Sequence, residues 1–295
     1  MKRKNDICVV SFIYPLIEDY LKEFIQSLNK QSYNNFDCII IDDKYNKSLN
    51  NFTGEIIVAP KEMSIIQIRT WIINKLIDCG YKLVIFIDAD DIMKENRVKK
   101  IIEEYGKTNG KYGFYYNELF LLKEKMDFYR GNLPEEMNHI NQILSGNCIG
   151  MSHTALNLGL IKNDIIKLKP SSQVIAYDWL LHSFLLLKGY KGKKVNTITY
   201  YRIYDNNIAG KVANTPDKIL LGIRVKKHHY FELMKYDSIF YSKYNQILKT
   251  EDYILKNGVD SYIKKLSNLK EEIFWWRNIK TLDELEEEKN DKNKW

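Results

Sequence analysis

Two carboxylates separated by one residue follow a run of apolar residues that is typical of a buried strand. The run covers residues 83–87, and Asp88, Asp90 and Asp91 come directly after it. Carboxylate oxygens are preferred ligands of Mg²⁺ and Mn²⁺, and such an ion can bind a diphosphate and stabilise the charge on a departing phosphate. We therefore predict that Asp88 and Asp90 hold Mn²⁺ or Mg²⁺, while Asp91 serves as the turn or cap residue.

A solvated turn with an aspartate as a helix cap is the more common explanation for an isolated pair of this kind. Here the preceding strand and the third aspartate favour a metal site. A second acidic pair, Asp42-Asp43, also follows an apolar run. Both pairs therefore stand where ligands bind in open parallel sheets, beyond the carboxyl ends of the strands.

The segments that must position these aspartates alternate between two hydrophobic periods. Short continuous runs of apolar residues predict buried strands, and apolar residues at helical spacing predict amphipathic helices between them. The predicted strands cover 8–13, 38–41, 56–59 and 83–87, and the predicted helices cover 17–28 and 65–76. This alternation predicts an α/β fold with a Rossmann-like, mostly parallel sheet and flanking helices.

The second half of the chain is less regular. A strand is predicted over 112–122, a polar connection over 123–150, a helix over 178–187 and a strand that ends at Tyr201, and the pattern is helical from Pro216 onward. We expect one catalytic domain over 1–212, a helical appendage over 213–285 with Phe274-Trp275-Trp276 as its packing anchor, and a tail over 286–295 that is a frayed helix or disordered.

Composition limits the classes of protein that need to be considered. Of the 295 residues 45% are hydrophobic and 28% are charged, so a large core can form. The net charge of +7 favours a phosphorylated or polyanionic partner. The four cysteines form no C-x-x-C pair, which argues against a zinc knuckle or a disulfide framework and favours reduced thiols in the cytoplasm. No apolar run approaches the roughly 20 residues that a transmembrane helix needs.

Several blocks, taken in order, resemble the inverting family 2 glycosyltransferases of the GT-A fold. The blocks are Val9-Val10-Ser11-Phe12-Ile13-Tyr14-Pro15, Ser27-Leu28-Asn29-Lys30-Gln31-Ser32-Tyr33, Cys38-Ile39-Ile40-Ile41-Asp42-Asp43, Arg69 and Phe86-Ile87-Asp88-Ala89-Asp90-Asp91. The resemblance covers residues 7 to about 105. It implies a GT-A domain that transfers a sugar from a nucleoside diphosphate with inversion.

The resemblance also implies roles for individual residues. Phe12, Tyr14 and Asp43, supported by Asp42, would contact the base and ribose of the donor, and Arg69 would approach the donor near the acidic strand. Asp88 and Asp90 would hold the metal and diphosphate. Lys44-Tyr45 replaces the usual Gly-Ser after the first acidic pair, and Thr70 stands where Asn commonly follows the arginine.

Two further segments resemble motifs of the same family. Tyr177-Asp178-Trp179 is similar to the motif that supplies the general base, which makes Asp178 the candidate to accept the proton of the acceptor hydroxyl. The alternative is that Asp178 caps a helix and Trp179 packs in the core. The segment from Tyr201 to Gly210 resembles the Tyr-Arg-x-His-x-x-Asn motif of a rhamnosyltransferase-like subset. It places Arg202 and Asn207 near the donor diphosphate.

The segment over 146–154 corresponds in order to the acceptor side of these enzymes. We expect Gly150, His153 and Trp179 on that side, because glycine permits close backbone approach. A lone histidine is, however, more often a partly buried hydrogen-bonding residue. Tyr204 stands where the rhamnosyltransferase-like motif has histidine, so an imidazole contact to metal or phosphate is missing there.

The combined prediction is a metal-dependent transferase that uses a UDP- or dTDP-sugar and a hydroxyl acceptor, either a surface glycan or a lipid-linked saccharide. It would work in the cytoplasm, with peripheral contact to the inner face of the membrane as an option. Three alternatives stay open. They are a glycosyltransferase acting on modified DNA, a non-enzymatic nucleic-acid-binding protein that uses Arg224, Lys227 and His228, and a haloacid-dehalogenase-like phosphotransferase. The last expects its acidic motif near the N-terminus.

Overall fold

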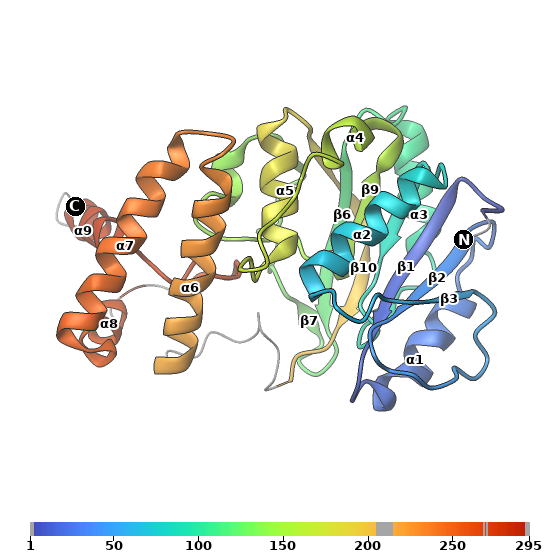
Figure 1. Ribbon diagram of the computed structural model, residues 1–295, viewed down its shortest axis with the longest axis horizontal. Helices are drawn as coiled ribbons and strands as arrows, with labels where there is room; N and C mark the ends of the chain where they lie inside the picture. The colour runs from blue at the N-terminus through green and yellow to red at the C-terminus, as the bar shows by residue number, and fades with distance from the viewer. Residues whose placement is uncertain (1–2, 205–214, 268, 270, 293–295) are drawn as a thin grey trace.

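One mixed sheet organises the computed structural model, which describes residues 3–204, 215–267, 269 and 271–292 (Figure 1). Within these residues ten strands form the sheet, and its main path runs β3-β2-β1-β4-β9-β6-β10-β5, with β7 paired to β6 and β8 paired to β10. The strands are β1 (Ile7–Ile13), β2 (Asp37–Asp42), β3 (Glu55–Val58), β4 (Leu83–Phe86), β5 (Ile92–Met93), β6 (Phe114–Leu121), β7 (Met126–Asp127), β8 (Glu136–Met137), β9 (Thr154–Asn157) and β10 (Gly192–Tyr201).

The first half of the sheet is parallel, as the alternating pattern predicted. Strand β1 pairs in parallel with β2 and β4, and β2 pairs in parallel with β3. The short strand β9, which was not predicted, then lies antiparallel between β4 and β6. The acidic pairs therefore follow strands β2 and β4, which flank β1 and end at the same edge of the sheet.

Helices cover both faces of the sheet because successive strand residues point to opposite faces. On one face α1 (Glu18–Asn29) and α3 (Arg97–Lys107) pack in a cluster that includes Val9 and Ile85. On the other face α2 (Ile65–Asp78), α4 (Leu158–Ile165) and α5 (Tyr177–Leu187) pack in the cluster that includes Val10 and Val84. This layered α/β arrangement confirms the predicted fold class.

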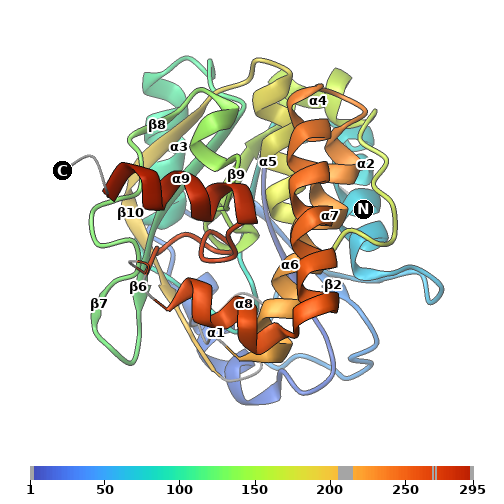
Figure 2. The ribbon, with the colours of Figure 1, turned by 90° about the vertical axis from the view of Figure 1, so that its left-hand side faces the viewer.

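A helical appendage packs against α5 at one side of the sheet (Figures 1 and 2). It consists of α6 (Pro216–Leu233), α7 (Ile239–Asn257), α8 (Val259–Leu266) and α9 (Leu282–Lys292). The His229 ring of α6 stacks on the Trp179 ring of α5 with centroids 3.7 Å apart, and both side chains are buried. Helix α9 continues to Lys292, where the sequence predicted a frayed helix or disorder. None of the described helices is long and apolar enough to cross a bilayer.

Two glycine substitutions test this packing in opposite directions. A Cβ at Gly192, the first residue of β10, would lie 2.0 Å from the Phe114 ring, whereas a Cβ at Gly106 in α3 would meet nothing within 4 Å. We expect Gly192→Ala to lower the free energy of unfolding by about 1–3 kcal/mol through overpacking. Gly106→Ala should raise it by about 0.5 kcal/mol through helix propensity.

Urea unfolding of both variants measures the two effects. A Gly192→Ala protein as stable as the wild type would contradict the close contact between β10 and β6.

Candidate active site

Three aspartates gather at the carboxyl end of β4. Carboxylate oxygens of Asp88, Asp90 and Asp91 lie within 4.8 Å of one another. The Asp91 N–H donates to the Asp88 carbonyl over 3.1 Å, which closes the turn that brings the three side chains together. Asp88 and Asp90 are half-buried and Asp91 is buried, so the first two are the more accessible members of the cluster.

Asp91 links three segments of the chain. Its carboxylate accepts a hydrogen bond from the Ser152 hydroxyl and another from the Arg202 N–H, the latter over 3.0 Å. Ser152 also accepts the Asp88 N–H over 3.2 Å. Asp91 therefore acts as the internal turn residue that the sequence predicted. The role of Ser152 was missed, because no local pattern marks it as a partner of residues more than sixty positions away.

Two tyrosines lie beside Asp90. The Tyr204 hydroxyl donates to Asp90 Oδ2 over 2.6 Å, and it also interacts with the Tyr14 hydroxyl. Burial and the negative charge of Asp90 raise the pKa of Tyr14 to about 12. Both phenols therefore stay neutral at physiological pH. Tyr204, at the position where the resembled motif has histidine, orients the second carboxylate of the pair.

A fully buried arginine supports the cluster from within the core. Arg97 donates from Nη2 to the Phe86 carbonyl over 2.8 Å and from Nε to Asn117 Oδ1 over 2.9 Å. Burial lowers the pKa of its guanidinium to about 9, while the charges of Asp91 and Asp88 act in the opposite direction. Arg97 is thus a positive charge inside the protein near an acidic cluster. Sequence reasoning did not identify it.

Burial makes the acidic cluster electrostatically unfavourable. Desolvation, with repulsion from Asp90 and Asp178, raises the pKa of Asp88 to about 6 against the opposing charge of Arg69. The pKa of Asp91 is raised well above its ordinary value by burial and by the other two carboxylates. A divalent cation would offset this repulsion, and oxygen donors are the set that Mg²⁺ and Mn²⁺ prefer. The residues present therefore fit such an ion.

Asp178, the candidate for the general base, is the second residue of α5 and lies near Asp88. Its Oδ1 accepts the Trp179 N–H over 2.8 Å, and its Oδ2 lies 3.6 Å from the point where a Gly150 Cβ would stand. Burial raises the pKa of Asp178, and the charge of Arg69 opposes this rise. The structure thus brings Asp178, Gly150, Arg69 and Asp88 together.

Arg69 of α2 lies near both Asp88 and Asp178. Its guanidinium carbon is 5.2 Å from the centroid of the Phe12 ring at the end of β1. Its positive charge opposes the rise in the pKa of both Asp88 and Asp178. Two residues that the family resemblance singled out, Phe12 and Arg69, therefore stand side by side next to the acidic cluster.

The other residues that were predicted to bind the sugar donor make different local contacts. Asp42 is buried and accepts N–H groups of Tyr45 and Asn46, so it shapes the turn after β2. Asp43 donates its N–H to the Ile13 carbonyl over 2.8 Å, which ties it to the end of β1. Asn207 lies outside the described residues.

Arg202 cross-links the acidic loop to α1. Its Nε donates to the Asp90 carbonyl over 2.9 Å, its Nη2 pairs with Glu23 over 2.7 Å, and its guanidinium carbon lies 4.7 Å from the Tyr20 centroid. The predicted contact of Arg202 with a donor diphosphate stays a prediction. In the structure its guanidinium holds the loop of Asp90 and forms an ion pair with Glu23.

Two predicted acceptor-side residues are buried. Trp179 is fully buried and donates its indole N–H to the Ile143 carbonyl over 2.7 Å. His153 is also fully buried, and desolvation lowers its pKa to about 3, so its ring is neutral. Both side chains therefore pack behind the site. Gly150 is the member of this group that adjoins Asp178.

The predicted basic face of α6 differs in exposure: Arg224 is exposed, and Lys227 and His228 are half-buried. Lys227 pairs with Glu251 over 2.7 Å, and the neighbouring Lys226 and His229 are buried. Lys226 donates to the Ile279 carbonyl inside the appendage. The binding of nucleic acid by Arg224, Lys227 and His228 stays a prediction.

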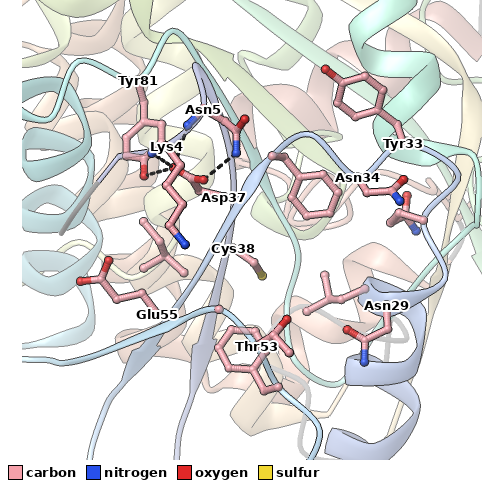
Figure 3. Close-up of a pocket in the computed structure, with 16 residues that line it drawn as sticks. Lys4, Asn5, Asn29, Tyr33, Asn34, Asp37, Cys38, Thr53, Glu55 and Tyr81 are labelled. Carbon is pink, nitrogen blue, oxygen red and sulfur yellow. Dashed lines mark hydrogen bonds between the residues drawn. The ribbon is translucent and has the colours of Figure 1, made fainter.

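A separate pocket of about 610 Å³ lies at the opposite end of the sheet, where β1 and β2 begin (Figure 3). Asp37 stands in this pocket and accepts hydrogen bonds from Asn5 and from the Tyr81 hydroxyl. Its lining contains none of the predicted site residues. The pocket is therefore distinct from the acidic cluster.

Solved structures share this fold, although no protein-family model and no curated protein matches the chain. TarS 1–349 of S. aureus, in complex with UDP-GlcNAc, is 14% identical, with a TM-score of 0.54 over 91% of this chain and 76% of that chain. The mannosyltransferase PcManGT from Pyrobaculum calidifontis, in complex with GDP-Man and Mn²⁺, is 8% identical, with a TM-score of 0.53 over 91% and 77%. These likenesses confirm the α/β fold of the GT-A type.

The raised pKa of Asp88 predicts opposite pH responses with and without metal. Since the folded-state pKa is about 6, above the ordinary 3.8, the metal-free protein should gain stability as the pH falls through 6. Protonated Asp88 is a poor ligand, so the rise in melting temperature caused by Mn²⁺ should be largest above pH 6.5 and should shrink toward pH 5.

Thermal unfolding with and without Mn²⁺ between pH 5 and pH 8 measures both responses. Asp88→Asn should remove the Mn²⁺ effect, whereas Asp19→Asn, an exposed aspartate of α1, should retain it. A Mn²⁺ shift that is equal at pH 5 and pH 8 would contradict the assignment.

Proposed function

We propose that this chain is a metal-dependent inverting glycosyltransferase of the family 2 type. The observation that carries the proposal is the meeting of Asp178 with Asp88 and Arg69 at the carboxyl edge of the sheet. Asp178 is then available as a base. It lies beside the aspartates after β4, which can hold a metal and a diphosphate. The GT-A fold and the UDP-GlcNAc and GDP-Man complexes of its structural neighbours support a nucleoside diphosphate sugar as the donor.

In this proposal the donor lies along the edge of the sheet. Asp88 and Asp90 would hold Mn²⁺ or Mg²⁺, which when bound would neutralise charge on the diphosphate. Phe12, Tyr14 and Asp43 would contact the base and ribose. UDP and dTDP are the proposed donor nucleotides.

Positively charged side chains of the protein would stabilise the negative charge of the diphosphate. Arg69 lies beside the acidic cluster, and Arg202 and Asn207 complete the proposed diphosphate contacts. Because the Arg202 guanidinium also binds Glu23 and the Asp90 carbonyl, its first contribution is to hold the acidic loop in place.

The proposed base is Asp178. Its Oδ1 is used by the Trp179 N–H, so Oδ2 is the oxygen that would take the proton from the acceptor hydroxyl. The raised pKa brings the carboxylate closer to the operating pH, which favours a general base. Attack from the face opposite the diphosphate would then invert the anomeric carbon. The proposed acceptor is a surface glycan or a lipid-linked saccharide, met in the cytoplasm or at the inner face of the membrane.

Replacing the base tests the reaction. We expect Asp178→Asn to lower the rate of nucleoside diphosphate release from the donor by about 10²–10⁴-fold, because the proton acceptor is lost. Donor affinity should stay within a factor of about two, since the amide keeps the shape and the Trp179 contact. A thermal-shift screen of nucleotide sugars with Mn²⁺ first identifies the donor. Unchanged turnover in Asp178→Asn would remove the assignment.

Replacing a metal ligand tests donor binding separately. Asp90→Ala should weaken Mn²⁺-dependent binding of UDP or dTDP by about tenfold or more, because one of the two proposed carboxylate ligands is lost. Tyr204→Phe is the matched control, since it removes the hydrogen bond to Asp90 but leaves the carboxylate. Calorimetric titration with and without Mn²⁺ measures the affinities. Equal affinity of Asp90→Ala and wild type would contradict the metal role.

A further inference from the structure

The segment between α8 and α9 returns from the appendage to the catalytic domain. The Asn147 N–H donates to the Trp275 carbonyl over 2.9 Å, and the two residues form an isolated antiparallel bridge. A Cβ at Gly146 would lie 2.7 Å from the Arg277 Cβ, so the two backbones approach as closely as a glycine allows. The segment is therefore held against the stretch that leads to Gly150.

The Trp275 side chain reaches the vicinity of the proposed base. The point where a Gly150 Cβ would stand is 3.1 Å from Trp275 Cη2 and 3.6 Å from Asp178 Oδ2. The indole and the carboxylate thus flank the same glycine. A residue from the C-terminal part of the chain stands beside the oxygen that would accept the proton.

Trp275 belongs to a group of three rings, which we call the aromatic wall. Its centroid lies 5.6 Å from that of Phe128 and 6.4 Å from that of Tyr201, and the centroids of Phe128 and Tyr201 are 5.8 Å apart. Phe128 and Tyr201 are half-buried, and Trp275 keeps 8% of its surface exposed. Tyr201 directly precedes Arg202, which binds the acidic loop. The wall therefore lies next to both parts of the proposed site.

Trp275 of the wall and two rings packed against it carry unpartnered polar atoms. Among the described residues, Trp275 Nε1, Tyr129 Oη and His153 Nδ1 are buried and make no hydrogen bond. The three rings form one cluster, because every pair of their centroids is 6.0 Å apart. Buried polar groups are normally paired, so a group of three marks a place where a polar partner is expected.

The backbone next to Trp275 is strained. Trp276 has a φ of 66°, in the left-handed region that a bulky residue rarely adopts. Such strain persists where surrounding contacts fix it, and it gathers at binding sites.

We propose that the partly exposed rings of Phe128 and Tyr201, held in place by the buried Trp275, form the acceptor subsite and determine which saccharide is accepted. Aromatic faces offer large, rigid contact area to the apolar face of a pyranose ring, while polar groups near them bind hydroxyls or the water that accompanies them. This inference rests on the proposed function. It assigns the helical appendage a part in substrate recognition, because the appendage carries the segment that completes the site.

Binding of simple glycosides to the full-length protein tests the subsite. The probes are the p-nitrophenyl glycosides of β-glucose, β-galactose, β-N-acetylglucosamine and α-mannose, measured by saturation-transfer NMR with saturating Mn²⁺ and UDP. We expect at least one probe to bind the wild type. Trp275→Ala and Phe128→Ala should each weaken it by about tenfold, and Trp275→Phe should weaken it less. Donor affinity should stay unchanged in all three.

Ile279→Ala is the structural control. Ile279 anchors the same segment by packing on Gly222 of α6, away from the wall. The Ile279→Ala substitution should lower the melting temperature without weakening glycoside binding. Phe128→Ala keeps the test valid if Trp275→Ala does not fold, because Phe128 is only half-buried.

The possible failures are separable. If the wild type binds no nucleotide sugar with Mn²⁺, the proposed function is wrong. If it binds the donor but no glycoside, or if the Trp275 and Phe128 variants bind the glycoside as well as the wild type, the subsite is wrong. If Ile279→Ala loses glycoside binding to the same extent, Trp275 only anchors the segment by packing, and the subsite is wrong.

Discussion

The whole site depends on keeping three carboxylates close together in a partly desolvated place. Arg97 makes this possible, because a buried guanidinium near the end of β4 supplies opposite charge where water is excluded. Its hydrogen bond to Asn117 extends to the Thr199 hydroxyl of β10, so one cation connects β4, β6 and β10. The Arg97 guanidinium thus offsets the repulsion among the aspartates, and its hydrogen bonds also connect the strands around them.

The antiparallel strand β9 is the second feature on which the site depends. By separating the parallel half of the sheet from β6 and β10, β9 places Ser152, just before it, against the acidic turn. Asp91 then receives hydrogen bonds from Ser152 and from the Arg202 backbone, which stands at the end of β10. Loops from both halves are thereby locked to one carboxylate, and Asp88 and Asp90 are left as the accessible oxygens.

The appendage extends this arrangement to the surroundings of Gly150, where Trp275 lies near Asp178. The stack of His229 on Trp179 and the bridge between Asn147 and Trp275 attach it to the rest of the chain at two separate places. A segment held in this way can line a site with rotamers fixed by packing, which is what selective binding of a small saccharide requires. Two lysines of α6 are used inside the protein, because Lys227 pairs with Glu251 and Lys226 donates to the Ile279 carbonyl.

The sequence by itself determined the α/β alternation, the ends of β2 and β4, and the acidic pair that follows β4. These features depend on local hydrophobic period and on residues adjacent in the chain. It also indicated Arg69 and Asp178 through the family resemblance. Only the tertiary structure decided that Arg97 is buried near the aspartates, that His153 and Trp179 pack behind the site, and that Trp275 stands beside Asp178. Burial and pairing arise from contacts between residues far apart in the chain, and no local pattern encodes them.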